Sequence, residues 1–314
     1  MNDVNSMKLI NIVTPCMNEE ENVEELYKRV RAVFDSLNYQ YEHIFIDNAS
    51  TDRTEEILRK LASQDPRVKV ILNTRNFGHV RSPYYAFLQT SADAVITMAS
   101  DLQDPPEKIP DFIRMWEKGY KVVVGIKTSS QEPGFFYFVR SMYYRVLRSL
   151  SDVRLIDNFT GFGLYDKKVV EILREFHDPY PYFRGLITDI GFEIADIEFD
   201  QPRRKRGITK NNFYTLYDLA MLGLVSYTKV PLRLAAMFGF LSSAISFFVG
   251  LVYLIYKLVD WKNFSLGLAP VVIGLFFLGS VQLFFLGIIG EYIGAIYTHV
   301  LHRPLVIEKE RINF

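Results

Sequence analysis

The chain contains little cysteine and no excess of charge of either sign. Cys16 is its one cysteine among 314 residues, which excludes an intramolecular disulfide and fits a reducing compartment. Lysine plus arginine and aspartate plus glutamate number 36 each, so the formal net charge is zero and nucleic acid is not expected as a partner. The opening residues, MNDVNSMKLINIV, lack the charged start and long apolar core of a secretory signal peptide. We therefore expect the first part of the chain to lie in the cytosol.

Charge is missing altogether from two long apolar stretches. The 23 residues after Arg233 and the 28 residues after Lys262 carry no charged side chain. About 20 apolar residues span the hydrocarbon core of a bilayer, so the sequence predicts a transmembrane hairpin at about 233–257 and 265–291. Buried helices of a soluble domain are the alternative, but two such runs back to back rarely occur in a soluble core.

Basic residues gather on one side of the predicted hairpin, whereas its connection, KLVDWK, is weakly charged. They are Arg203, Arg204, Lys205, Arg206, Lys210, Lys229 and Arg233 before it and Arg303, Lys309 and Arg311 after it. The positive-inside bias then predicts a multi-pass protein of the cell (inner or plasma) membrane, with both termini and the large domain in the cytoplasm.

Short β-branched runs alternate with helical patterns in the first 125 residues. KLINIVT, YEHIFI, VKVIL, AVITM and YKVVV suit buried parallel strands. Asn18 with Glu21, and Asp52 with Glu55, have the spacing of helix capping boxes. The pattern predicts an α/β fold with a doubly wound, Rossmann-like parallel sheet, whose ligands bind beyond the carboxyl ends of the strands.

Two amphipathic segments, at 135–150 and 211–229, combine an apolar face with basic residues. Core packing is one interpretation, and a position at the membrane interface is favoured by the neighbouring hairpin.

The expected organisation has four parts. A cytosolic domain covers 1–205, a juxtamembrane interfacial helix 206–230, the hairpin 231–300, and an extended, polar cytosolic tail 301–314.

The fourth predicted strand ends in carboxylates but lacks a pair of aspartates two residues apart. Asp101 follows this strand, and Ala99 stands where the first member of such a pair would be. Asp104 is expected to cap the helix that is entered through Pro105 and Pro106. The strand end is therefore either a metal site with one ligand fewer or only a polar strand end.

Seven stretches, in this order, carry a family resemblance: VTPCMNEEENV, IDNASTDRT, RNFGHVRSPYYA, SDLQDPPEKIP, YFRGLITDIGF, RRKRGITK and the hairpin with GIIGEYIGAIY. Together they resemble the inverting nucleotide-sugar glycosyltransferases of the GT-A fold in glycosyltransferase family 2. Within that group they look like the polyisoprenyl-phosphate glycosyltransferases, which include dolichol-phosphate mannose synthases and bactoprenol glucosyltransferases. The resemblance covers nearly the whole chain.

The resemblance implies a nucleotide-sugar site and a divalent metal. The residues it assigns to the nucleotide sugar are Pro15, Met17, Glu19, Asp47, Arg75, Asn76 and Asp101. A carboxylate such as Asp47 can accept a hydrogen bond from a uracil imide, although it can equally close a turn. The family's usual Asp-X-Asp-Leu-Gln-Asp implies Mg²⁺ or Mn²⁺ on Asp101 and Gln103. A donor diphosphate and water supply most of the oxygens that such an ion needs, so the loss at Ala99 weakens the site without abolishing it.

The acceptor side departs from the family as well. Many relatives carry Gly-Asp-Phe-Arg where this chain has Thr160, Gly161, Phe162 and Gly163, so Asp157 becomes the candidate catalytic carboxylate; a loop-capping aspartate is the alternative. Cations are needed where two anions approach each other. The candidates for the phosphate groups are Arg140, Arg184, Arg203, Arg206 and Lys210. A general juxtamembrane basic patch is the alternative for the residues just before the hairpin.

The expected function is transfer of a hexose, with glucose favoured, from a UDP-sugar to polyprenyl (undecaprenyl) phosphate with inversion, by a homo-oligomer at the membrane. One alternative is a processive polysaccharide synthase, but neither Trp116 nor Trp261 lies in the Gln-X-X-Arg-Trp motif of those enzymes. Another is a membrane protein that binds nucleotide sugars without catalysis.

Overall fold

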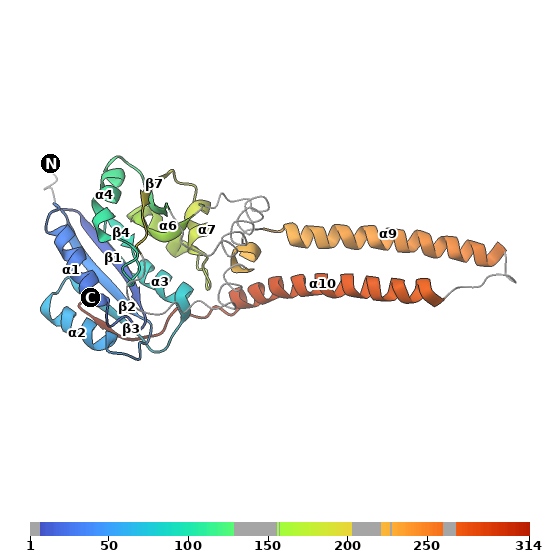
Figure 1. The fold of residues 1–314 in the computed structure, drawn as a ribbon, viewed down its shortest axis with the longest axis horizontal. Helices are drawn as coiled ribbons and strands as arrows, with labels where there is room; N and C mark the ends of the chain where they lie inside the picture. Colours follow the sequence, from blue (N-terminus) through green and yellow to red (C-terminus); the bar gives the residue numbers. More distant parts are fainter. Residues whose placement is uncertain (1–6, 129–155, 157, 203–220, 227, 260–267) are drawn as a thin grey trace.

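A computed structural model describes residues 7–128, 156, 158–202, 221–226, 228–259 and 268–314. An α/β body lies at one end, and two long helices extend from it (Figure 1). The strands are β1 (Leu9–Cys16), β2 (Gln40–Asp47), β3 (Val68–Asn73), β4 (Ala94–Thr97), β5 (Val122–Lys127), β6 (Phe159–Asp166), β7 (Ile194–Phe199) and β8 (Glu308–Ile312). The helices are α1 (Val23–Phe34), α2 (Thr54–Gln64), α3 (Gly78–Leu88), the 3-10 turn η1 (Pro106–Lys108), α4 (Ile109–Glu117), α6 (Lys167–Glu175), α7 (Phe183–Asp189), α9 (Val230–Val259) and α10 (Leu268–Val300).

The described strands form one sheet in the order β7-β5-β6-β4-β1-β2-β3-β8. β4, β1, β2 and β3 are parallel neighbours, which confirms the predicted parallel sheet for the first four strands. The fifth predicted strand does not lie beside β4, because β6 enters between them and pairs antiparallel with both β4 and β5. The sheet is therefore mixed, and its parallel half brings the carboxyl ends of β1, β2 and β4 to one edge.

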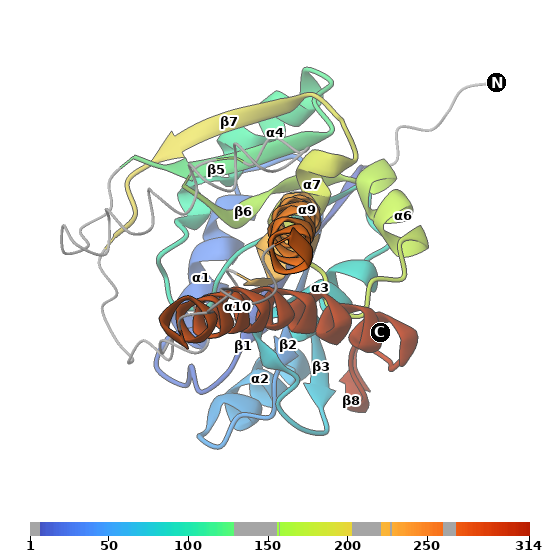
Figure 2. The ribbon, with the colours of Figure 1, turned by 90° about the vertical axis from the view of Figure 1, so that its right-hand side faces the viewer.

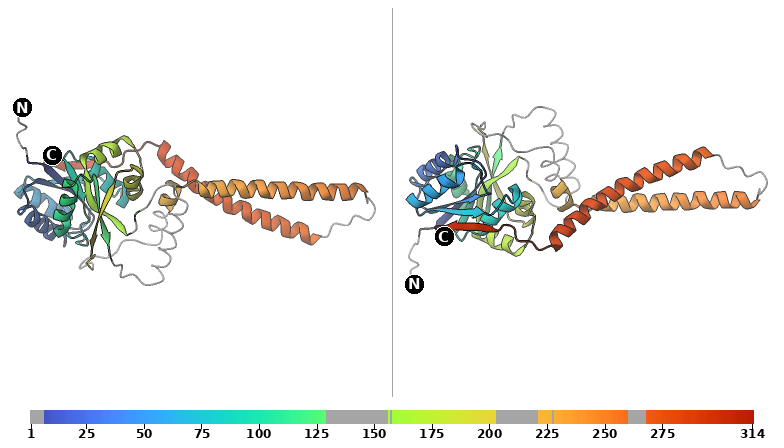
Figure 3. Two further views of the ribbon diagram at one scale, coloured as in Figure 1. Left: turned by 90° about the horizontal axis from the view of Figure 1, so that it is seen from above. Right: turned by 90° about the horizontal axis from the view of Figure 1, so that it is seen from below.

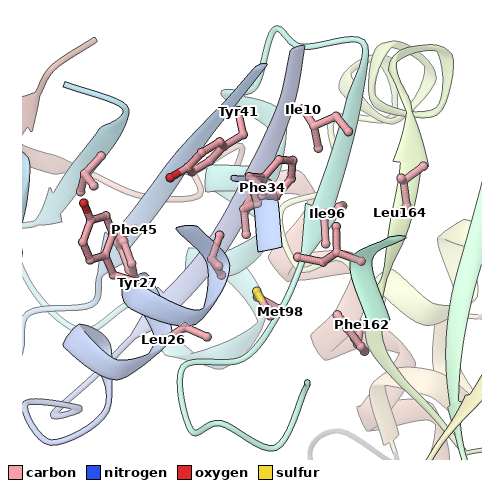
Figure 4. Packing of buried hydrophobic residues seen from close by; sticks show 14 of the residues in the cluster. Ile10, Leu26, Tyr27, Phe34, Tyr41, Phe45, Ile96, Met98, Phe162 and Leu164 are labelled. Carbon is pink, nitrogen blue, oxygen red and sulfur yellow. The ribbon is translucent and has the colours of Figure 1, made fainter. Parts of the chain in front are cut away.

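Helices cover both faces of the sheet because its strands are apolar on both sides. One buried cluster joins the strands to α1, α2 and α4 through Leu26, Leu58 and Phe112. Figure 4 shows the packing of part of this cluster, with Leu26 of α1 beside the strands. The other cluster joins them to α3, α6 and α7, with Phe87 and Ile187 among its buried members. In Figure 2 the helices lie on either side of the sheet. This arrangement confirms the doubly wound α/β prediction.

The predicted capping box before α1 is wrong. Helix α1 begins at Val23, four residues later than a cap at Asn18 requires. Asn18 has a positive φ of 56°, and its side-chain oxygen accepts a hydrogen bond from the backbone N–H of Thr51 at 2.7 Å. The side chain is thus used between two loops rather than at a helix end, a competition that short polar side chains often enter.

The predicted cap of α2 is half correct. Asp52 accepts hydrogen bonds from the backbone N–H groups of Thr54 at 3.0 Å and Glu20 at 3.2 Å, so it does satisfy a donor at the start of α2. Glu55 does not reach back to it, because its carboxylate is bound by Arg59 and Lys309. Cations from outside the first turn therefore replace the reciprocal half of the box.

The tail after α10 returns to the sheet. Strand β8 pairs antiparallel with β3, so the predicted extended tail is confirmed and becomes the edge of the sheet. Asn313 donates to the carbonyl oxygens of Ala62 and Val68 at 2.7 and 2.9 Å. The C-terminal end thus lies beside α2 (Figure 1).

Helices α9 and α10 are long and apolar enough to cross a membrane, with mean hydropathies of 2.1 and 2.4 and their apolar windows not buried in the protein. Close to the α/β body they cross (Figure 3), where the rings of Phe238 and Phe285 stack at 6.0 Å. The Tyr292 hydroxyl also donates to the Thr228 carbonyl at 2.7 Å. These two exposed apolar helices associate the protein with a membrane. The segment at 135–150 and most of the segment at 211–229 lie outside the described residues.

Candidate active site

Polar loops meet where the parallel strands end. Pro15 is at the end of β1, Asp47 ends β2, and Asp101 lies four residues beyond β4. Since parallel strands end at the same edge of a sheet, these loops lie at one edge, and their use as a common binding site stays a prediction.

Asp47 closes the loop that follows β2. Its side chain is 1 % exposed, and its carboxylate accepts hydrogen bonds from the backbone N–H of Ser50 at 3.0 Å and from the Ser50 hydroxyl. Burial raises the pKa of Asp47 above its usual range, and the hydrogen bonds from Ser50 oppose this rise. Asp47 therefore has the turn-closing role that the sequence leaves open, and its contact with a uracil stays a prediction.

An asparagine network holds the third loop against the first two. Asn48 accepts from Asn73 at 3.1 Å and from the backbone N–H of Phe77 at 2.9 Å, and it donates to Asn76 at 2.8 Å. Asn76 in turn donates to the Met17 sulfur at 3.1 Å. The structure thus brings together Met17 and Asn76, two predicted nucleotide-site residues that are 59 positions apart.

Sequence reasoning missed Asn48 and Asn73 as members of this network. The signal for Asn48 was available, because it directly follows Asp47 at the end of β2. An amide can donate and accept at once, whereas a carboxylate only accepts, and Asn48 uses both capacities. Arg75 lies over the Phe77 ring at 4.1 Å, so this loop also presents a cation at the site.

The two predicted metal ligands flank an unusual backbone. Leu102 has a positive φ of 62° and is buried, a conformation that non-glycine residues adopt only rarely. Asp101 accepts a hydrogen bond from the backbone N–H of Gln103 at 3.1 Å, and the Gln103 amide donates to the Pro202 carbonyl at 3.3 Å. Because the Gln103 nitrogen makes that bond, its side-chain oxygen remains an acceptor.

The side chains at this strand end supply only part of the ligand set that a hard divalent cation needs. Among the described residues no group of three His, Cys, Asp or Glu side chains is placed to hold a metal. Asp101 and Gln103 offer a carboxylate and an amide oxygen, which are suitable ligand types for Mg²⁺ or Mn²⁺. The remaining oxygens must come from a bound diphosphate and water.

Asp104 does not cap the following helix, contrary to the prediction. The 3-10 turn η1 has Pro105 at its N-cap and no side-chain cap. Asp104 instead points back toward the strand end, is 4 % exposed, and accepts a hydrogen bond from the backbone N–H of Ala99 at 2.8 Å. Burial, together with the charge of Asp101, raises the pKa of Asp104 to about 7, although the Ala99 N–H opposes the rise.

A cavity of about 280 Å³ adjoins this strand end. Its lining comes from the ends of β1 and β4, from α3, from the start of β6 and from the start of α7, and includes Pro15, Ala99, Asp104, Thr160, Gly161 and Arg184. Arg184, a predicted phosphate-binding residue, is thus brought to the same place as Pro15. Gly161 has a φ of 105°, which a residue with a side chain rarely adopts.

Several predicted residues lie outside the described residues: Asp157, Arg140, Arg203, Arg206 and Lys210. Glu19 lies in the first loop, where its backbone N–H donates to the Thr54 hydroxyl at 2.8 Å.

Comparison with known proteins decides the family. Residues 11–176 match the description Glycosyl transferase family 2, and residues 230–296 match the GtrB C-terminal hairpin. The chain belongs to glycosyltransferase family 2. The predicted resemblance, the GT-A architecture and the enzyme class are thereby confirmed.

Relatives of this glycosyltransferase match it over nearly its whole length. It is 36 % identical over 94 % of the chain to the uncharacterized glycosyltransferase YkcC of Bacillus subtilis, 92 % of which is covered. It is 34 % identical over 96 % of the chain to the bactoprenol glucosyl transferase of Shigella phage SfV, 98 % of which is covered.

A solved structure, glucosyl-3-phosphoglycerate synthase from Mycobacterium tuberculosis in complex with Mn²⁺, UDP-glucose and phosphoglyceric acid, is 18 % identical. It matches 69 % of this chain and 78 % of its own, with a TM-score of 0.46.

Proposed function

We propose that this glycosyltransferase moves glucose from UDP-glucose to polyprenyl phosphate, in the form of undecaprenyl phosphate, at the cytosolic face of the cell membrane. The observation that carries the proposal is the joining, in one chain, of a family 2 domain to the GtrB C-terminal hairpin. A membrane hairpin beside the catalytic body suits an acceptor that is itself a lipid. The Shigella phage relative named as a bactoprenol glucosyl transferase supports the same acceptor and sugar.

The loops at the strand ends would bind the donor. In this proposal Pro15, Met17, Glu19, Asp47, Arg75 and Asn76 surround the nucleotide, and Asp101 with Gln103 holds Mg²⁺ or Mn²⁺ at the diphosphate. When bound, the cation offsets the negative charge that develops on the departing UDP. The asparagine network keeps the loops in place before the donor arrives, which lowers the ordering cost of binding.

The acceptor phosphate needs little activation, because a phosphate monoester with a second pKa near 6 is mostly dianionic at neutral pH. Asp157 would orient the acceptor or take its last proton. Arg184, which lines the cavity, would offset the repulsion between the two anionic substrates, with Arg140, Arg203, Arg206 and Lys210 in the same role. One displacement at the anomeric carbon then gives inversion, so an α-linked donor yields a β-linked lipid phosphate sugar.

The proposal includes a topology and an assembly. Helices α9 and α10 would span the membrane as a hairpin with both termini in the cytoplasm, and the protein would work as a homo-oligomer. The predicted divisions at residues 205, 230 and 300 stay part of this proposal.

Transfer by the purified full chain in detergent tests the function. The protein is incubated with undecaprenyl phosphate, Mg²⁺ or Mn²⁺ and a panel of labelled nucleotide sugars, and the lipid product is extracted and analysed by proton NMR. We expect a β-linked glucosyl phosphate lipid from UDP-glucose. A long carbohydrate product would favour a polysaccharide synthase, and donor binding without transfer would favour a binding protein.

A further inference from the structure

The cavity beside Ala99 contains a buried carboxylate with unused hydrogen-bonding capacity. Asp104 lines the cavity and is 4 % exposed. One of its oxygens, Oδ2, accepts from the Ala99 N–H at 2.8 Å, and within the described part of the chain no other hydrogen bond to this side chain is present. The second oxygen, Oδ1, is not enclosed by protein atoms, so it is reached from the cavity that Asp104 lines and can accept a hydrogen bond from a ligand there.

We infer that Asp104 recognises the sugar of the donor, its Oδ1 accepting a hydrogen bond from a hydroxyl of a hexose ring held in this cavity. The inference rests on the proposed function and adds the residue that decides which sugar is used.

The size and lining of the cavity suit one sugar ring. Its volume of about 280 Å³ lies at the lower end of the range for small-molecule sites. Apolar and aromatic side chains, among them Val80, Tyr182 and Phe183, form much of its wall and can contact the C–H groups of a sugar. Polar groups are few, which is the pattern by which a pocket fixes the orientation of its ligand.

The hydrogen-bonding capacity of Asp104 favours a neutral polyol as the occupant. The hydroxyl groups of a polyol donate hydrogen bonds to a carboxylate oxygen, whereas a phosphate dianion has no proton to donate to it.

Ala99 leaves room beside Asp104. Position 99 lines the same cavity and carries only a methyl group, so Asp104 provides the one acidic side chain among the described lining residues. The neighbouring wall is fixed, since the Gly161 carbonyl accepts from the Tyr165 hydroxyl at 3.0 Å and from the Thr97 hydroxyl.

The variant Asp104→Asn distinguishes recognition of the sugar from a structural role in holding the loop through the Ala99 N–H. An asparagine oxygen can still accept from the Ala99 N–H, and its amide then presents donors to the cavity in place of the acceptor. Binding of UDP and of UDP-glucose to the full chain in detergent, with Mg²⁺, is measured by titration calorimetry. We expect UDP affinity within about twofold of the wild type, and UDP-glucose affinity lowered about tenfold or more.

A matched control is Asp65→Asn, which alters a buried aspartate whose partners are Tyr27 and Arg67 rather than the cavity. It should leave the ratio of UDP-glucose to UDP affinity unchanged. Asp104→Ala is the second variant and should lose the same preference for UDP-glucose over UDP, with the melting temperature showing that each variant is folded.

Two results would overturn the inference while leaving the proposed function intact. One is Asp104→Asn binding UDP-glucose as tightly as the wild type does. The other is equal weakening of UDP and UDP-glucose, which identifies Asp104 as a brace for the loop. A wild-type protein that binds UDP but does not bind UDP-glucose overturns both the inference and the proposed function.

Discussion

The guanidinium of Arg59 on α2 donates to Glu310 on β8 at 3.1 Å, across 251 positions of the chain. Arg59 also donates to Glu55 at 2.9 Å, so the C-terminal strand is attached to the helix beside it as well as to β3. The chain that follows α10 is therefore held on the α/β body by contacts with both β3 and α2.

Breaking this ion pair should cost little by itself. Arg59 and Glu310 are 38 % and 44 % exposed at their side chains, and exposed pairs contribute roughly 0.2–1 kcal/mol. We expect Arg59→Ala to lower the free energy of unfolding by at most about 1 kcal/mol. A double-mutant cycle with Glu310→Ala, measured by denaturant unfolding in detergent, gives the coupling energy between the two side chains. A coupling energy of several kcal/mol would contradict this expectation.

Acid should weaken the fold partly through Asp65. Two nitrogens of Arg67 donate to this buried carboxylate at 2.9 and 2.8 Å, and these bonds hold the pKa of Asp65 at about 2. An unfolded aspartate titrates near 3.9, so the folded pKa is the lower one and the stabilisation is present above about pH 4. It should be lost as the pH falls from about 4 to 2, by up to about 2 kcal/mol.

The variant Asp65→Asn tests this pH dependence. It should be less stable than the wild type at neutral pH and lose less stability between pH 4 and 2. Equal acid slopes for the two proteins, measured by denaturant unfolding, would assign the acid sensitivity to other carboxylates.

The metal prediction depends on Asp101. Asp101→Asn removes the carboxylate of the partial ligand set and should reduce divalent-dependent turnover by at least about a hundredfold, with UDP-sugar binding weakened in the presence of the metal. Ala99→Asp adds a carboxylate two residues away and should be tolerated. Turnover of Asp101→Asn that keeps the wild-type metal dependence would place the ion elsewhere.

Cysteine labelling tests the topology. In intact cells an impermeant thiol reagent should label a cysteine placed at Asp260, between the two apolar helices, and should label Ile307→Cys only after lysis. The native Cys16 is buried, 2 % exposed, and should remain unlabelled in the folded protein. External labelling at position 307 with protection at position 260 would reverse the proposed orientation.

The sequence predicts the parts of the fold that depend on local pattern. The stripe Val23, Leu26, Tyr27, Val30 and Phe34 is buried as the 3.6-residue period requires, and the first four strands follow from their apolar runs. The position of β6 between β4 and β5 could not be read in this way, because antiparallel insertion depends on pairing between distant segments. The pairing of β8 with β3 could not be predicted for the same reason.

At the candidate site, local pattern identified residue types but not their partners. The strand-end rule placed Pro15, Asp47 and Asp101 at one edge. Hydrogen bonds from the Thr51 N–H to Asn18 and from the Ala99 N–H to Asp104 replace the predicted caps, because each side chain finds a backbone donor in a loop rather than at a helix end. A carboxylate before two prolines looks the same in sequence whether it caps a helix or turns back into a cavity.

The pairing of β8 with β3 imposes an order on synthesis. Glu308–Ile312 follows both apolar helices in the chain, so β3 has no outer neighbour until the hairpin has left the ribosome. Unpaired strand edges are templates for aggregation, and a chain interrupted within the hairpin keeps such an edge open. The sheet can therefore be completed only after both apolar helices have been synthesised. A chain that stops before Glu308 exposes the outer edge of β3, whereas the complete chain covers it with β8.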